Sequence, residues 1–224
     1  MASGNGRGAG TSAARAAVLA RIRAATRGEA LEPVAVPRDY ATRSPLEAAD
    51  RVDRFAERVA EYRASVSRVA EAEIAQRVVV LARERGARRI VVAPGVPEAW
   101  RPDGLELVAD RNLAAPALDR LDGVLTGCAL AVAETGTIVL DGAALSGRRA
   151  LTLVPDWHAC IVRADQVVGS VPEAVGAMGE AAAEGRPLTL VSGPSATSDI
   201  ELRRVEGVHG PRTLIVVLAG AGPT

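Results

Sequence analysis

The sequence predicts an α/β protein: an open, mostly parallel sheet flanked by helices, with N-terminal helices and a partly antiparallel section in the middle. Three observations carry this prediction. The runs at 89–93 (RIVVA) and 213–218 (TLIVVL) are continuously apolar, as strands covered on both faces are. A helical segment at 71–85 separates two strand-like runs, which is the layout of a βαβ unit with parallel strands. From Gly123 onward, strand-like runs follow one another without helices, which favours antiparallel pairing.

Composition and charge bound the classes of function. The chain has 224 residues, of which 48% are apolar and only 2% aromatic, so we expect one core built from aliphatic side chains. The formal net charge is zero, so nothing favours nucleic acid or an anionic membrane as a partner. No apolar run approaches the ~20 residues that span a bilayer. Because we find no secretory signal either, we expect a cytoplasmic protein.

The cysteines and histidines argue against a metal or cluster site on this chain. Cys128 and Cys160 are too few for a four-thiolate cluster and do not form a CxxC pair, so we expect no iron–sulfur centre here. His158 and His209 show no HExxH-type spacing, so we expect no dedicated metal site.

We expect three parts along the chain. Residues 1–11 are Gly-rich without apolar periodicity and are expected to be disordered. Residues 12–63 form a helical appendage, whose second helix begins at Ser44 as N-cap, followed by Pro45. Residues 64–224 form the α/β domain. Its expected strands are 64–69, 89–93, 105–108, 130–134, 137–140, 150–154, 160–163, 188–191 and 213–218, and its expected helices are 71–85, 114–121, 170–184 and 198–204.

The run VSGPSATSDIE, residues 191–201, joins a predicted strand to a predicted helix. At a helix N-terminus its backbone N–H groups and hydroxyls favour an anion, and in open α/β sheets ligands bind at the carboxyl ends of strands. The alternative is a turn whose hydroxyls only cap the helix. The run matches neither a Walker loop nor GxGxxG. The candidate ligand-binding residues are Ser192, Gly193, Ser195, Thr197 and Ser198.

Four charged or titratable residues are further candidates. Glu134 precedes a tight Thr-Gly-Thr turn, a position at which a carboxylate is suited to act as a nucleophile or general base. The alternative is that its carboxylate bonds the backbone of that turn. His209 lies in a Gly-rich loop. It is a candidate general base or anion-binding group, and the alternative is a purely structural role. Arg148 and Arg149 are a candidate clamp for a carboxylate or phosphate.

Three runs resemble a known family: TGCALAVAETGTIVLDG, GRRALTLVPDWHACIVRADQVVGSVPEAV and PLTLVSGPSATSDIELRRVEGVHGPRTLIVVL. They resemble the lactate-utilisation protein C family, whose members are LUD domains. The resemblance implies a fold akin to the group of ribose-5-phosphate isomerase, CoA transferases and methenyltetrahydrofolate synthetase. It also implies membership of a three-protein bacterial set that oxidises L-lactate to pyruvate. The other two members resemble iron–sulfur oxidoreductase subunits, so the clusters are expected on those partners.

Three functional hypotheses follow. The first is an accessory or substrate-handling subunit that binds a small carboxylate or other anion between the 192–198 loop, Glu134 and the Arg148–Arg149 pair. The second is a stand-alone enzyme on a phosphorylated or folate-like anion, by analogy with the fold group, in which a Glu serves CoA transferases as nucleophile. The third is a structural partner that docks the redox subunits through its N-terminal helices. We favour the first. The sequence leaves open whether the chain is itself catalytic and whether it forms a homo-oligomer.

Overall fold

The computed structural model describes residues 8–26, 35–197, 205–207 and 209–220. Contacts divide the chain into two units, Met1–Tyr40 and Ala41–Thr224. The first unit contains helix α1 (Gly8–Ala25), whose Val18 and Ile22 are largely exposed. Of residues 1–11, for which disorder is expected, 8–11 belong to α1 and 1–7 lie outside the described residues.

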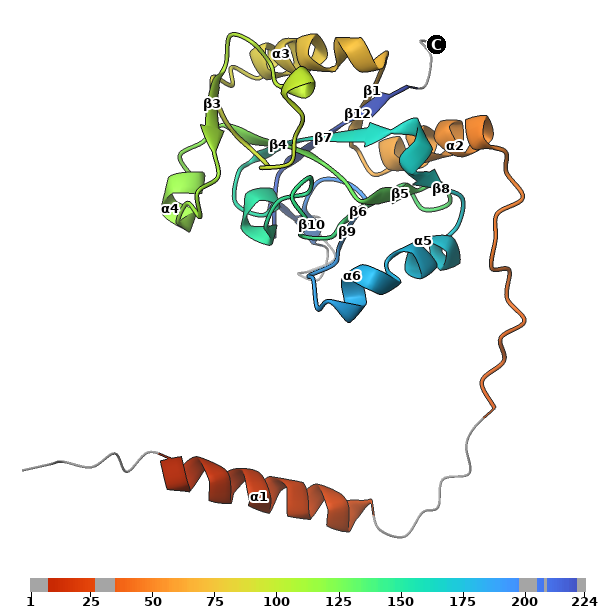
Figure 1. Cartoon of the computed structure of the whole chain (residues 1–224), viewed down its shortest axis with the longest axis vertical. Helices are drawn as coiled ribbons and strands as arrows, with labels where there is room; N and C mark the ends of the chain where they lie inside the picture. The colour runs from red at the N-terminus through yellow and green to blue at the C-terminus, as the bar shows by residue number, and fades with distance from the viewer. Residues whose placement is uncertain (1–7, 27–34, 198–204, 208, 221–224) are drawn as a thin grey trace, which may run out of the picture. The chain divides into compact units, whose positions relative to one another are not determined.

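The second unit is built around a six-stranded sheet in which every neighbouring pair of strands is parallel (Figure 1). The strand order is β1-β12-β7-β4-β2-β3. The central strands are continuously apolar because both of their faces are covered. The bounds are β1 (Ser65–Val69), β2 (Arg89–Val92), β3 (Glu106–Ala109), β4 (Gly123–Gly127), β7 (Trp157–Arg163) and β12 (Thr213–Ala219).

A smaller sheet of mixed direction has the strand order β8-β5-β6-β9. Strand β6 pairs antiparallel with both β5 and β9, whereas β8 pairs parallel with β5. The predicted α/β class is therefore confirmed, with its mostly parallel sheet and its partly antiparallel section. The bounds are β5 (Leu130–Val132), β6 (Thr137–Leu140), β8 (Val167–Val168) and β9 (Thr189–Val191).

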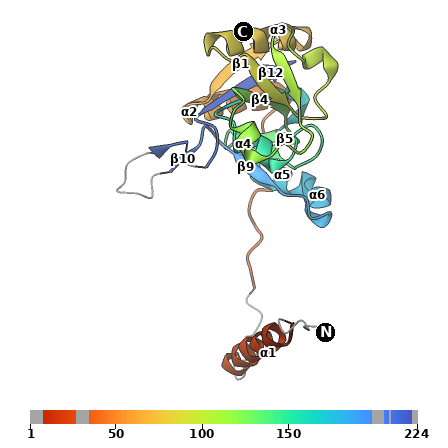
Figure 2. The same ribbon diagram turned by 90° about the vertical axis from the view of Figure 1, so that its left-hand side faces the viewer.

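Helices cover the two sheets in layers (Figures 1 and 2). Helix α3 packs Val78 against one face of the six-stranded sheet, in a cluster with Ile161. Helix α2 and the small sheet cover the other face, in a cluster with Val216. Helix α5 lies on the outer face of the small sheet around Ala174, and α6 follows it. The helix bounds are α2 (Ala48–Glu61), α3 (Ile74–Glu84), α4 (Ala115–Leu118), α5 (Val171–Ala177) and α6 (Gly179–Ala183).

Helix α2 packs as part of the α/β unit. Phe55 and Val59 are fully buried in the core that α2 shares with β7 and β12. The sequence places a boundary between residues 63 and 64, whereas the contacts place it between Tyr40 and Ala41, because the apolar face of α2 is buried against the sheet. None of the helices in the described ranges is long and apolar enough to cross a bilayer.

Several predicted elements differ in the structure. The prediction of a strand at 150–154 is wrong. The chain forms a short 3-10 helix there, Arg149–Thr152, and the Leu151 side chain of this helix is fully buried in the core. The strand expected at 160–163 begins at Trp157 and belongs to the six-stranded sheet. Helix α2 begins after Glu47 instead of Ser44, because the Ser44 hydroxyl accepts the nearby Leu46 N–H in a local turn.

The two later helices also differ from the prediction. The helix expected over 170–184 is two helices, α5 and α6, with a break at Met178 beside two glycines. The helix expected over 198–204 lies outside the described residues. Before it, Ala196–Thr197 form strand β10, which pairs antiparallel with β11 (Val205–Glu206). The loop at 192–195 therefore leads into a strand.

Candidate functional site

The main pocket lies at the amino ends of the parallel strands β7 and β12. Its floor contains His158 and Leu214, each the second residue of its strand, and its volume is about 420 Å³. Residues 189–196 form one wall, residues 209–211 form another, and Tyr62 closes a third side. Strand β9, which forms the first part of this first wall, belongs to the small sheet. The predicted placement of this loop at the carboxyl ends of the parallel sheet is therefore wrong.

The carboxyl ends of β2 and β4 are covered by the loop at 141–148. Gly95 donates its N–H to the Ala144 carbonyl at 2.8 Å, and Gly127 donates its N–H to the Leu145 carbonyl at 3.0 Å. These bonds extend the backbone pairing beyond the strand ends. A ligand position that open α/β sheets commonly use is thus filled by the protein itself.

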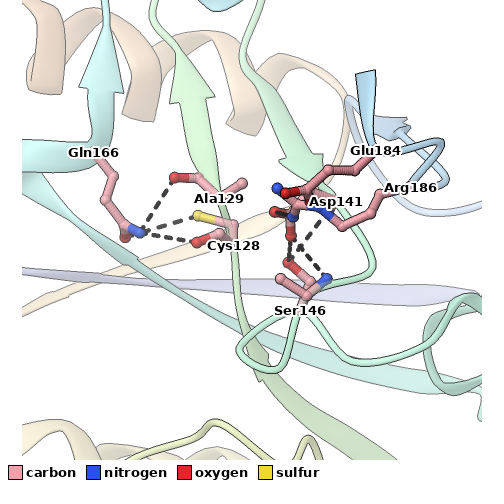
Figure 3. A network of polar contacts seen from close by, with 8 residues as sticks. Cys128, Ala129, Asp141, Ser146, Gln166, Glu184 and Arg186 are labelled. Atoms are coloured by element: carbon pink, nitrogen blue, oxygen red, sulfur yellow. Dashed lines mark hydrogen bonds and ion pairs between the residues drawn. The ribbon is translucent and has the colours of Figure 1, made fainter. Parts of the chain in front are cut away.

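Figure 3 shows the side chains that hold this covering loop. Asp141 accepts hydrogen bonds from the Ser146 hydroxyl at 3.0 Å and the Ala143 N–H at 3.1 Å, and it pairs with Arg186. Burial acts to raise the pKa of Asp141, but these hydrogen bonds outweigh it and hold the pKa below its usual value. On the other side of the view, Gln166 donates to the Cys128 carbonyl at 2.8 Å.

Two of the predicted loop residues are fixed by close neighbours. The Ser192 hydroxyl lies 2.8 Å from the Thr137 hydroxyl, which in turn lies 2.7 Å from that of Thr135. Gly193 approaches Tyr62 so closely that a Cβ would lie 2.7 Å from both the Cβ and the carbonyl oxygen of Tyr62. These contacts set the position of the loop wall.

Ser195 ties the two walls of the pocket together. Its N–H donates to the Pro211 carbonyl at 2.8 Å, and its carbonyl accepts the Gly207 N–H at 2.8 Å. Its hydroxyl accepts the backbone N–H of His209 at 3.0 Å. Thr197 lies in β10 opposite Val205, and Ser198 lies outside the described residues. The helix N-terminus that was expected to hold an anion is therefore not part of the described pocket.

A second cavity, of about 600 Å³, adjoins the main pocket, because Leu153, His209 and Gly210 line both. It contains two arginines. Arg212 pairs with Asp156 at 3.4 Å, and both side chains are exposed. The Arg149 guanidinium forms no hydrogen bond or ion pair with another residue that the structure describes, whereas the Arg149 carbonyl accepts the Thr152 hydroxyl at 3.3 Å. Asp119 and Asp156 line the same cavity, so its two arginines and two carboxylates balance in formal charge.

Arg148 lies elsewhere and is fully engaged. It forms a two-point ion pair with Asp110 and donates to the Leu113 carbonyl at 2.6 Å. The hydrogen bond from Arg148 lowers the pKa of the Asp110 carboxyl. The predicted clamp of two neighbouring arginines does not form, because only Arg149 faces the cavity.

Glu134 also lies outside the pocket. It lines a separate cavity of about 260 Å³ with Arg43, Arg54 and Ser170. The structure therefore brings together Ser192, Gly193, Ser195 and His209, with Arg149 in the adjoining cavity. Their roles in ligand binding stay predictions.

His158 is the pocket residue that sequence reasoning left without a role. It is 2% exposed, and its Nε2 lies 2.8 Å from the hydroxyl of the buried Thr126 on the neighbouring strand. The sequence signal that could have identified His158 is a polar residue within an otherwise apolar strand, WHACIV. The free cysteines Cys128 and Cys160 are both buried, and the interaction between their thiols lowers the pKa of Cys160 while it raises that of Cys128.

Comparison with known proteins identifies the family. The chain matches the LUD domain over residues 52–219. The chain belongs to the LUD-domain family. This LUD-domain chain is 48% identical over 202 residues to lactate utilization protein C of Deinococcus radiodurans, which covers 89% of this chain and 91% of that relative. It is 35% identical over 94 residues to lactate utilization protein C 1 of Bacillus mycoides, 40% of each chain.

A solved structure is similar to this LUD domain as well. A DUF162 family protein from Deinococcus radiodurans superposes with a TM-score of 0.69 at 41% sequence identity, covering 79% of this chain and 100% of that chain. The family resemblance seen in the sequence is thus confirmed. Within the described ranges, His, Cys, Asp and Glu do not gather in a group of three or more that suits a metal ion.

Proposed function

We propose that this LUD-domain chain is a cytoplasmic accessory or substrate-handling subunit of a system that oxidises L-lactate to pyruvate, in which partner subunits carry the iron–sulfur clusters. The observation that carries the proposal is the 48% identity to a lactate utilization protein C over 91% of that relative. The chain has two cysteines, both buried and free, which are too few to hold a four-thiolate cluster.

The main pocket and its adjoining cavity support a role in handling a small anion. Lactate and pyruvate are carboxylates, and a guanidinium binds a carboxylate through two parallel hydrogen bonds. Arg149 is available for such a bond, and Arg212 and His209 lie in the same cavity. The apolar Leu190 and Leu214 in the main pocket suit the carbon chain of the ligand.

Binding measured by calorimetry on the full chain tests the ligand part of this proposal. We expect L-lactate or pyruvate to bind the native chain, and the double variant Arg149→Ala/Arg212→Ala to lose about tenfold or more in affinity, because both arginines of the adjoining cavity are removed. Arg88→Ala, at an exposed arginine that lines neither cavity, serves as the matched control.

Co-purification with the neighbouring iron–sulfur subunits tests the subunit part. A stable complex that contains this chain supports the proposal. If the purified chain alone turns over a phosphorylated or folate-like anion and does not associate with those subunits, the proposal is wrong and the hypothesis of a stand-alone enzyme replaces it.

A further inference from the structure

We propose that the free edge of strand β9, together with the main pocket that it borders, is a docking groove for an extended segment of a partner protein. The segment adds to the small sheet as a further strand beside β9. The strand order β8-β5-β6-β9 leaves β9 at the edge of that sheet. The proposal rests on this edge and does not depend on whether the pocket binds a small carboxylate.

The backbone of Leu190, at the centre of β9, points away from the sheet. The Val139 carbonyl in β6 accepts the Ala129 N–H at 2.9 Å, so the polar backbone groups of Val139 face β5. Leu190 lies opposite Val139 in the antiparallel pair of β6 and β9. Because opposed residues alternate between bonded and non-bonded pairs, the N–H and C=O of Leu190 face the open side. Neither group has a hydrogen-bond partner among the described residues, so both are free to bond an added strand.

The edge at β9 lacks the charged residues that commonly protect an edge strand from pairing. The edge strands of the six-stranded sheet each contain a charged residue, Arg68 in β1 and Glu106 in β3. Strand β9 has the sequence TLV, and its central Leu190 is 65% exposed. An uncharged edge with an exposed apolar residue is typical of a site where another chain adds a strand.

An apolar surface continues from this edge over the outer face of the small sheet. Leu190 and Val139 line a hollow of about 160 Å³ on that face, and Val175 of helix α5 and Met178 line its other side. Val175 is 68% exposed, so α5 covers only part of the face. Exposed apolar patches mark interaction sites. We therefore expect an apolar side chain opposite Leu190 in the added strand, since directly opposed residues of paired strands share a face.

The main pocket provides space for the other face of the added strand. Strand β9 is part of the wall at residues 189–196, which borders the cavity of about 420 Å³. Successive side chains of a strand point to opposite faces, so every second side chain of the segment points toward the pocket. The pocket floor is mixed in character, with His158 beside Leu214. A small side chain with a hydroxyl, such as that of Thr, suits this floor.

The walls of the pocket favour a single extended segment over a second copy of this chain. Residues 209–211 form another wall, and the Ser195 N–H joins the two walls by its bond to the Pro211 carbonyl. A paired strand lies about 4.8 Å from its neighbour, so a lone segment is narrow enough to follow β9. The β9 edge of a second copy is bordered by the same 209–211 loop, and two such edges meet only with a collision of these loops.

The probe is the blocked peptide acetyl-Val-Thr-Val-Thr-Val-Lys-amide, whose lysine provides solubility. Two-dimensional NMR of the full chain at pH 7 measures its affinity and the exchange of backbone amides. We expect a dissociation constant of about 1 mM or tighter, with shifts centred on Leu190 and slower exchange of its N–H. The Val191 N–H faces β6 and is the internal reference, protected with and without peptide.

Three outcomes of this titration overturn the proposal. The first is the absence of amide shifts, and the second is shifts that lie away from β9. The third is protection of the Leu190 N–H in the free chain that increases with protein concentration, because it shows that two copies pair at this edge.

Two N-methylated peptides test whether the contact is made by the backbone. Methylation of the central Val removes the N–H that faces Leu190, and we expect it to weaken binding about tenfold or more. Methylation of the first Thr removes an N–H that faces away from β9, so this peptide is the matched control. Equal affinities of the two methylated peptides contradict strand addition.

Leu190→Pro removes a hydrogen bond from the other partner. Proline there loses only an N–H that β6 does not use, so we expect a folded chain with about tenfold or more weaker peptide binding. Leu190→Ala keeps the N–H and is expected to weaken binding less. Val191→Pro removes a bond to β6 and is expected to lower the melting temperature. Equal losses of affinity in Leu190→Pro and Leu190→Ala contradict the proposal.

Thermal unfolding shows whether each variant is folded. If Leu190→Pro does not fold, the two methylated peptides on the native chain decide the question. Failure of the proposed role in handling a small carboxylate shows in the calorimetry with L-lactate and pyruvate, and it leaves the peptide measurements unchanged.

Discussion

Arg148 and Asp110 form a two-point ion pair, with Nε to Oδ2 at 2.6 Å and Nη2 to Oδ1 at 2.9 Å. The Asp110 side chain is only 5% exposed, and Arg148 also donates to the Leu113 carbonyl. Arg149, its neighbour in sequence, is exposed and faces the cavity beside the main pocket. Two adjacent arginines thus have different environments, one structural and one open to a ligand.

The first prediction separates these two environments. Arg148→Ala leaves Asp110 as a nearly buried carboxylate without its cation, so we expect the free energy of unfolding to fall by about 2–4 kcal/mol. Arg149→Ala removes an exposed side chain that forms no hydrogen bond or ion pair among the described residues, and it is expected to change the free energy of unfolding by less than about 0.5 kcal/mol. Urea denaturation at pH 7 measures both. Equal effects of the two substitutions contradict this assignment.

The second prediction concerns pH and Glu173. The backbone N–H of Ser44, with those of Gly169 and Ser170, lowers the pKa of the Glu173 carboxyl in the folded chain. Because the folded pKa lies below the unfolded value of about 4.3, this stabilisation is fully present above about pH 5. It is lost as the pH falls through the folded pKa.

Denaturation curves of the native chain and of Glu173→Gln, recorded between pH 3 and pH 7, test this assignment. We expect the native chain to be more stable by about 1 kcal/mol at pH 7, and the difference to shrink toward pH 3. A difference that stays constant with pH, or grows in acid, is the outcome that rules it out.

The third prediction concerns the close contact between Gly123 and Trp157. A Cβ at Gly123 would lie 2.2 Å from a ring carbon of Trp157, which is buried in the core. Gly123→Ala is therefore expected to destabilise the fold by about 1–3 kcal/mol and to change the tryptophan fluorescence of the folded chain.

Gly176→Ala is the control for this contact. Gly176 lies inside helix α5, and nothing stands within 4 Å of a Cβ there, so alanine is expected to stabilise the chain by about 0.5–1 kcal/mol. Fluorescence-monitored unfolding of both variants decides the question. A Gly123→Ala chain as stable as the native one would show that the core relaxes around the added methyl group.

Local patterns in the sequence were enough for much of the fold. Uninterrupted apolar runs such as 213–218 predict strands covered on both faces, and these are the central parallel strands. The run at 150–154 has the same apolar character but forms a 3-10 helix, because Leu151 reaches the core from a turn. Composition alone does not distinguish a buried segment without strand pairing from a strand.

The candidate site was harder to predict because its contacts are long-range. The composition of residues 192–195 marks a loop that walls a pocket, but the partner of Ser192 is Thr137, 55 positions earlier. The bond that closes the Glu134 cavity joins Ser44 to Glu173 across 129 positions. Glu134 and the 192–198 loop therefore lie in different cavities, a separation that only the packing of the two sheets decides.

The central claim is that this LUD-domain chain takes part in lactate oxidation, and one reconstitution tests it most directly. The rate at which L-lactate reduces an artificial electron acceptor is measured with the neighbouring iron–sulfur subunits alone, with this chain added, and with its Arg149→Ala/Arg212→Ala variant added. We expect the native chain to raise the rate about tenfold or more and the variant to restore only a small part of that increase. A rate that is the same with and without the native chain would contradict a role of this chain in lactate oxidation.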